Sequence, residues 1–279
     1  MTTVIASPLP LPRFGDLLAA EWLKLRTLRS TYWALGLGAL AVISFNANAA
    51  RADYVDYPHY NAMMRAHFEN TALFDAFTRG AAMILILTVA SVGAITVVGE
   101  YSTGLIRTTF AAVPDRRALM SAKVSVVTAV MTGYGLVVAG ASFAASQAIL
   151  SGRHAGLSIT HPGAWRVIVA SALLAPVSAL AGMALGALIR HSATTMVLTA
   201  GVLLLLPEFV TDRYHWTACV RNALPFNAWE RLVQVNYGHV PSLLGSRYPT
   251  TVGGAWTVFA VWAAVAVVVT VVGVDRRDA

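Results

Sequence analysis

The sequence predicts an all-α membrane protein with six transmembrane helices in one transmembrane domain, residues 1–279. Of its 279 residues, 57% are hydrophobic and only 12% are charged, whereas soluble domains carry about 25% charged residues. The mean hydropathy is +0.65. Several uncharged windows are also long enough for a helix to cross a bilayer, which takes about 20 residues. This composition excludes a disordered chain, and a single cysteine, Cys219, excludes a disulfide scaffold.

A short amphipathic helix is predicted first, over residues 13–29. Leu18, Trp22 and Leu25 fall on one helical stripe. The charged residues lie largely elsewhere on this helix: Asp16, Glu21, Lys24 and Arg26. Such a helix can lie in the headgroup layer of a membrane. It is either a simple flank of the first span or an elbow that slides along the membrane surface as the spans move.

Six spans are predicted after this helix, each within a window that lacks Asp, Glu, Lys and Arg. They cover residues 30–50, 80–99, 124–150, 167–189, 191–207 and 252–274. Their continuous apolar runs favour helices, because membrane barrel strands alternate apolar and polar residues. The fifth span is the shortest, since it must fit between Arg190 and Glu208.

Lysine and arginine predict the orientation. They are denser in the N-terminal segment, in the 100–123 loop, at Arg190 and at the C-terminus than in the other loops. Because cytoplasmic loops carry an excess of these residues, we expect both termini in the cytoplasm. We expect the protein in the plasma membrane, with Cys219 on the outer side.

No motif in the sequence predicts an enzyme. The chain has no phosphate-binding loop, no H-E-x-x-H and no C-x-x-C. We therefore expect no catalytic, cofactor-binding or metal-binding residues and no nucleic-acid partner. The spans also lack the ionisable residues that ion-coupled carriers use, so an energy source outside this chain is expected.

The loop after the second span carries the most structured motif. It reads Glu100-x-x-x-Gly104-x-x-Arg107, then Pro114-x-Arg116-Arg117, with Lys123 entering the third span. A proline ends one helix and starts a turn, and Gly104 would allow close approach of a neighbouring backbone. The arginines would either bind acidic groups of a partner or contact anionic lipid and fix the orientation. Glu100 is expected to pair with a basic neighbour in this chain or in a second copy.

Together with the opening segment at residues 18–30, this order of motifs resembles the permease subunits of ABC-2 type ABC transporters. The resemblance implies that Glu100, Gly104, Arg107, Pro114, Arg116 and Arg117 belong to a coupling segment with a cytoplasmic coupling helix. That helix would dock on a separate ATPase subunit, which would hold ATP and Mg. A second permease, identical or different, and export of a substrate are also implied. The alternative is an ATP-independent channel or an assembly scaffold.

Two further patterns concern packing and substrate. Ser178, Gly182 and Gly186 recur every four residues in the fourth span, which favours close helix packing within one subunit or between two. Aromatic residues in the loops at 51–79 and 208–247 predict short interfacial helices, as anchors or at an outer mouth. The polar residues of the spans are uncharged, which favours an apolar or amphipathic substrate. They include Asn46, Asn48, Thr88, Ser91, Thr96, Ser142, Ser146 and Gln147.

Overall fold

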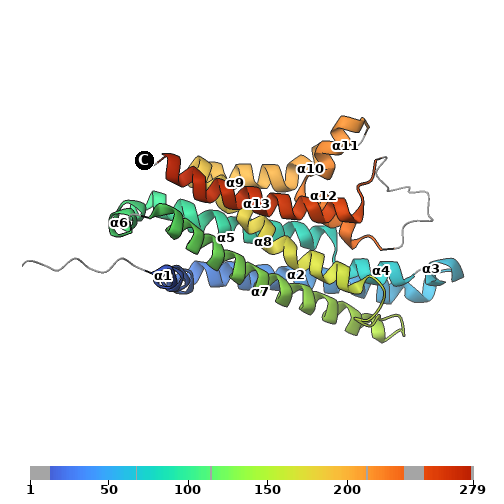
Figure 1. The fold of residues 1–279 in the computed structure, drawn as a ribbon. Helices are drawn as coiled ribbons and strands as arrows, with labels where there is room; N and C mark the ends of the chain where they lie inside the picture. Colours follow the sequence, from blue (N-terminus) through green and yellow to red (C-terminus); the bar gives the residue numbers. More distant parts are fainter. Residues whose placement is uncertain (1–12, 67, 114, 212, 236–247, 278–279) are drawn as a thin grey trace, which may run out of the picture.

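The fold is a bundle of long helices (Figure 1). The computed structural model describes residues 13–66, 68–113, 115–211, 213–235 and 248–277, and within these ranges every regular element is helical. Six helices are long and apolar enough to span a membrane. The predicted all-helical class with six spans is therefore confirmed at this level.

Five of the six spans are single long helices. These are α2 (Arg29–Asp56), α5 (Arg79–Ser102), α7 (Arg116–Ser151), α8 (Ala164–Ile189) and α13 (Val252–Arg277). At a rise of 1.5 Å per residue, a helix as long as α7 measures about 54 Å, so it extends well beyond a hydrocarbon core of about 30 Å. The predicted spans thus cover only part of α2 and α7, whose charged ends continue past them.

The fifth span is assembled from three pieces. They are α9 (Ser192–Ala200), a π-helical turn η2 (Gly201–Leu205) and α10 (Leu206–Phe209). The amide of Leu206 donates to the carbonyl oxygen of Gly201, five residues earlier. Pro207 follows at once and has no amide hydrogen to offer the previous turn. The wider turn keeps the span helical up to this proline.

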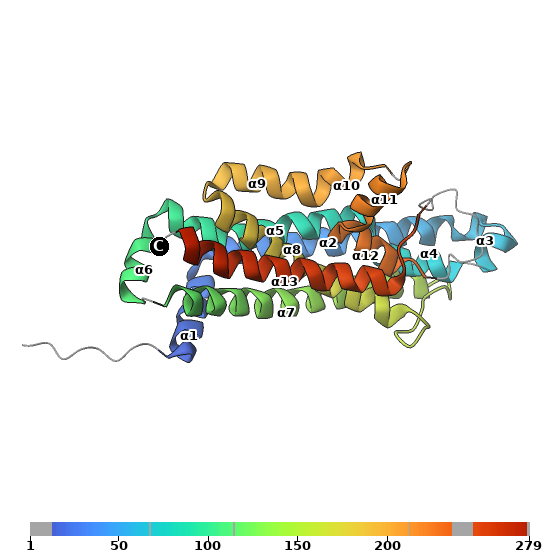
Figure 2. The same ribbon diagram turned by 45° about the horizontal axis from the view of Figure 1, so that its top comes forward.

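The shorter helices precede or connect the long ones. They are α1 (Phe14–Thr27), η1 (Tyr57–His59), α3 (Ala62–Ala66), α4 (Phe68–Asp75), α6 (Leu105–Ala112), α11 (His215–Asn222) and α12 (Pro225–Val233). Helices α1 and α6 lie at one end of the bundle, crosswise to the long helices, and α13 ends there too (Figure 2). We call this the α1–α6 end. The opposite end, with α3, α4 and α11, is the α3–α4 end.

Helix α8 is the centre of the bundle. It packs against α5, α7 and α13, and Ser178 in its middle is fully buried. A Cβ added to Gly182 would overlap the carbonyl oxygen of Ala90 in α5, and one on Gly186 would stand 3.0 Å from Val98 Cγ2. These small residues place α8 against α5 of the same chain.

Helix α12 lies in the 208–247 loop, for which interfacial helices are predicted. Phe226 and Trp229 are buried, with relative exposures of 0% and 1%. The indole Nε1 of Trp229 donates to Ser171 Oγ of α8 at 3.0 Å. These two aromatic side chains therefore pack inside the bundle, and the interfacial location of the helix stays a prediction.

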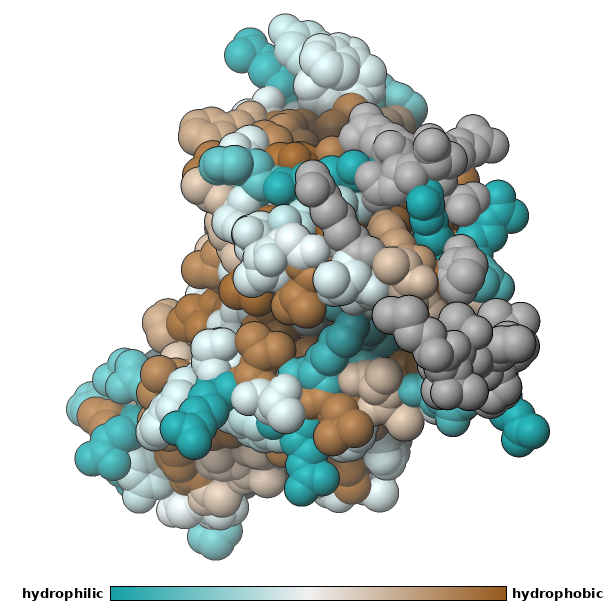
Figure 3. Space-filling model, turned by 90° about the vertical axis from the view of Figure 1, so that its left-hand side faces the viewer, coloured by the Kyte–Doolittle hydropathy of each residue, from teal (hydrophilic) through white to brown (hydrophobic). Residues whose placement is uncertain are grey.

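The outward faces of the long helices are apolar. Examples with more than half of the residue exposed are Trp33, Leu37, Leu40, Val137, Val197 and Val268. In a soluble protein so much exposed apolar surface would be unfavourable, whereas lipid chains would cover it in a membrane. Seen from the α1–α6 end, hydrophilic and hydrophobic residues are interspersed over the surface (Figure 3).

Candidate functional site

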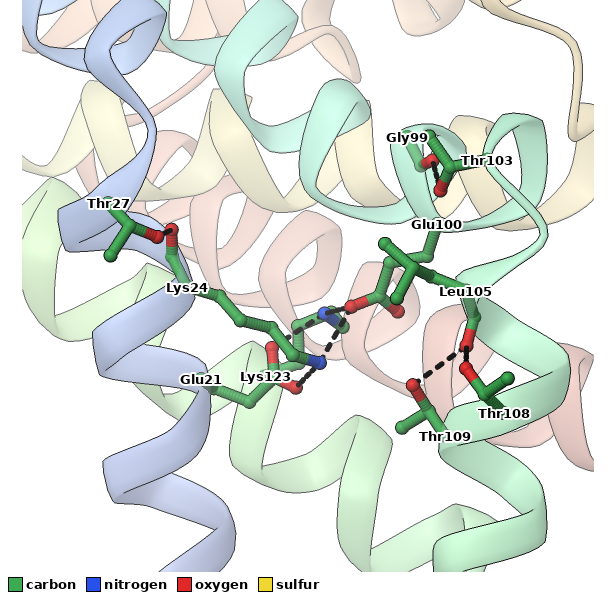
Figure 4. A network of polar contacts seen from close by, with 10 residues as sticks. All are labelled: Glu21, Lys24, Thr27, Gly99, Glu100, Thr103, Leu105, Thr108, Thr109 and Lys123. Carbon is green, nitrogen blue, oxygen red and sulfur yellow. Dashed lines mark hydrogen bonds and ion pairs between the residues drawn. The ribbon is translucent and has the colours of Figure 1, made fainter.

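A cluster of two lysines and two glutamates ties together three segments at the α1–α6 end (Figure 4). Lys123 Nζ of α7 lies 2.6 Å from Glu21 Oε2 of α1 and 2.8 Å from Glu100 Oε1 of α5. Lys24 Nζ of α1 lies 2.6 Å from Glu21 Oε1 and 2.8 Å from Glu100 Oε1. The expected pairing of Glu100 with basic residues thus occurs within this chain.

The cluster is buried and has no net charge. Glu21, Glu100 and Lys123 are only 3%, 8% and 3% exposed, while the side chain of Lys24 is 39% exposed. Isolated charges would be very costly at such positions, but two positive and two negative groups compensate one another. The cluster therefore fixes α1 against the end of α5 and the start of α7.

Lys24 is the member of the cluster that faces outward. Burial alone would lower the pKa of Lys24, but its hydrogen bonds to Glu100 and Glu21 outweigh burial and raise the pKa above its usual value of 10.5. Lys24 is therefore a fixed positive charge at neutral pH.

The turn between α5 and α6 depends on Gly104. This residue precedes α6 with φ +73°, a left-handed conformation that glycine adopts without strain. A Cβ at this position would meet nothing within 4 Å. The expected close approach of another backbone is therefore absent from the described part of the chain, and the glycine serves the turn itself.

The start of α7 is organised by Asp115. Its side chain accepts from the amide of Ala118 at 2.9 Å and caps the helix. Arg116, the next residue, lies with its guanidinium 5.0 Å from the ring centroid of Phe110 in α6, and Arg117 is exposed. Pro114 and the side chain of Arg107 lie outside the described residues.

Arg190 joins this surface from the end of α8. It adopts φ +59°, unusual for a residue with a Cβ, and its guanidinium lies 4.7 Å from the ring centroid of Tyr101. A groove beside α6 is lined by Tyr101, Gly104, Phe110, Arg116 and Arg190, among others. Two arginines from segments distant in sequence thus flank one aromatic-lined groove.

Helix α1 buries Leu17 and Glu21 against the bundle and leaves the predicted apolar stripe partly exposed. Leu17 and Glu21 are its buried residues, whereas Leu18 and Leu25 are half-buried and Trp22 is 50% exposed. The spacing of Leu17, Glu21 and Lys24 is i, i+4 and i+7, which marks one helix face. That spacing is the signal that could have placed Glu21 and Lys24 at the site.

Several polar residues of the spans have partners inside the bundle. Asn46 Oδ1 accepts from the amide and the hydroxyl of Thr78 at 3.0 and 2.8 Å. Gln147 Nε2 donates to the carbonyl oxygen of Ala72 at 2.8 Å. These two residues hold the ends of helices together, whereas Ser142 and Ser146 have no hydrogen-bond partner for their hydroxyl oxygens within the described ranges.

The described residues contain no group of three or more His, Cys, Asp or Glu side chains placed to hold a metal ion. A scan against protein-family models and a search of curated proteins both found no match to this chain.

Proposed function

We propose that this protein is the membrane-spanning permease subunit of an ATP-driven ABC transporter, with the α1–α6 end in the cytoplasm. One observation carries the proposal: α6 is a short helix, crosswise to the bundle, between the second and third spans. A force applied to such a helix reaches α5 and α7 directly, because only a short turn separates it from each.

The charged cluster supports this role. Lys123 follows α6 closely in sequence and binds Glu21 of α1 and Glu100 of α5. Movement of the α6 segment would therefore be passed to α1 and to both neighbouring spans as one unit. On this proposal α1 is the elbow, α6 the coupling helix, and Gly104 and Glu100 the joint between α6 and the second span.

The groove beside α6 supplies the surface for an ATPase. Arg116 and Arg190 flank it and Arg117 lies exposed next to it, so an acidic and apolar partner surface would be complementary. The ATPase would bind and hydrolyse ATP with Mg, and a second permease would complete the transporter. The spans offer no charged pathway of their own, which favours export of an apolar or amphipathic molecule.

The test is co-purification with an ATPase subunit, to be sought first in the genes beside the one for this chain. Charge reversal by Arg116→Glu with Arg117→Glu should reduce ATPase recovery about tenfold or more, since like-charge contacts across an interface cost several kcal/mol. Arg153→Glu, which alters an exposed arginine just beyond the opposite end of α7, is the control. Equal ATPase recovery with both variants, or no ATPase bound to the native chain, would favour an ATP-independent channel or scaffold.

A further inference from the structure

The α1–α6 end contains a pocket lined in part by the charged cluster. It has a volume of about 430 Å³ and lies between α1, the start of α2, α5, α6 and α7. Ligand sites in proteins typically measure about 300–1,000 Å³ and are mostly apolar with a few polar groups. Its apolar lining comprises Leu25, Leu28, Ile95, Leu105, Val126 and Val127.

The polar part of the pocket is the charged cluster. Glu100 lines the pocket, and its Oε2 is buried without a hydrogen-bond partner among the described residues. An unpaired buried carboxylate oxygen is costly, so its presence in a native fold requires an explanation. In Figure 4 the Glu100 carboxylate lies between the lysines and α6, whose Leu105 and Thr109 also line the pocket.

Lys24 supplies a donor beside this acceptor. Its ammonium group has three hydrogens and makes two hydrogen bonds, to Glu21 and Glu100. Its side chain is 39% exposed and lines the same pocket. Because the four charges cancel, the polar group that suits this site is itself neutral overall and offers both a hydrogen-bond donor and an anionic acceptor.

The residues around the opening of this pocket indicate that such a ligand enters from the membrane. Leu28, Ile95 and Leu105 are each more than 40% exposed at the pocket. Trp22 of α1 and Trp33 of α2, on the two helices that form one side, are 50% and 71% exposed. Exposed tryptophans beside apolar surface favour the boundary between headgroups and hydrocarbon.

We infer that this pocket binds a bilayer phospholipid with a primary ammonium headgroup, phosphatidylethanolamine. Its ammonium would donate to the Glu100 carboxylate, whose buried Oε2 would turn toward the pocket as the lipid enters. Its phosphate would accept from Lys24, and one acyl chain would lie along the apolar wall. This inference holds whether or not an ATPase docks, so it stands or falls separately from the proposed function.

Lipid retention by the purified full-length chain tests the inference. The chain is incubated in detergent with phosphatidylethanolamine, phosphatidylcholine or phosphatidylglycerol of identical acyl chains, and bound lipid is measured by native mass spectrometry. Phosphatidylcholine keeps the charge of the headgroup but lacks N–H donors. We expect the chain to retain about ten times more phosphatidylethanolamine than either of the other two lipids. Loss of one charge-assisted hydrogen bond lowers the affinity by about this factor. Equal retention of the three, or preference for phosphatidylglycerol, would overturn the inference.

A pocket-filling variant supplies the second arm. Gly99 lines the pocket, and a Cβ there would meet nothing within 4 Å, so Gly99→Leu should abolish retention while the fold is kept. Gly140→Leu is the matched control, since Gly140 is exposed on α7 with equally open space. If Gly99→Leu does not fold, Ile95→Trp narrows the pocket from an exposed position. Unchanged retention in the folded pocket variant would also refute the site.

Discussion

Gly182 of α8 lies against the main-chain carbonyl of Ala90 in α5, so closely that any Cβ would overlap the oxygen. The contact is reciprocal, because Gly93 of α5 meets the carbonyl of Ala179 in α8 in the same way. Gly135 of α7 makes a third contact of this kind, with Ala172 of α8. Helix α8 thus approaches two neighbours at backbone distance, which small residues allow in membranes.

Gly182→Ala should therefore destabilise the protein. Overpacking a tight contact typically costs about 1–3 kcal/mol, and the added methyl must push α5 and α8 apart. The matched control is Gly140→Ala, at an exposed helical position with open space, which should stabilise the fold by about 0.4–1 kcal/mol. Thermal unfolding in detergent measures both, and effects of the same sign would contradict the packing argument.

Lys123→Met should be the most damaging single change in the charged cluster. Removing one partner of a buried ion pair costs about 3–5 kcal/mol, because the remaining charge stays buried and uncompensated. Lys24→Met should lower the free energy of unfolding by a smaller amount, since the side chain of Lys24 is 39% exposed. Both are measured by the thermal midpoint of the purified chain.

A compensating variant separates charge balance from general damage. Adding Glu21→Gln to Lys123→Met restores a neutral cluster, so the double variant should be more stable than Lys123→Met alone. If the double variant loses as much stability as the two single variants together, Glu21 and Lys123 do not act as a pair.

Glu230 should make stability depend on pH. Burial raises the pKa of Glu230 above its usual 4.5, although Arg79 and Arg221 oppose the shift; Arg79 Nη1 lies 3.0 Å from its carboxylate. The folded state therefore holds this proton more tightly than the unfolded state, and stability falls as pH rises through the interval that begins near 4.5. The thermal midpoint of the native chain should fall relative to Glu230→Gln between pH 4.5 and neutrality. A constant difference between the two would contradict the assignment.

Cys219 tests the orientation. It is exposed on α11, away from the α1–α6 end (Figure 1), and should react with a membrane-impermeant thiol reagent in intact cells. The control carries Cys219→Ser with Thr108→Cys, which places the thiol on exposed α6 and should label only after permeabilisation. The reverse pattern would invert the topology.

The sequence is sufficient to predict the spans because a charge in the bilayer is costly, so uncharged windows mark them directly. The charged cluster is harder to predict, since helical periodicity identifies a face and not its partner. Glu21 meets Lys123 across 102 residues, and no local pattern encodes that distance. Helix α12 shows the same limit, because Trp229 suits an interface and a core equally well until its contact with Ser171 is seen.

The distance along the chain between Glu21 and Lys123 also sets an order of assembly. With 102 residues between them and translation at about 5–20 residues per second, α1 waits roughly 5–20 s after its own synthesis for its main counter-charge. During that interval the carboxylate of Glu21 has Lys24 as its available partner on the same helix. The ion pair that docks α1 onto α7 can therefore form only after α7 has been synthesised.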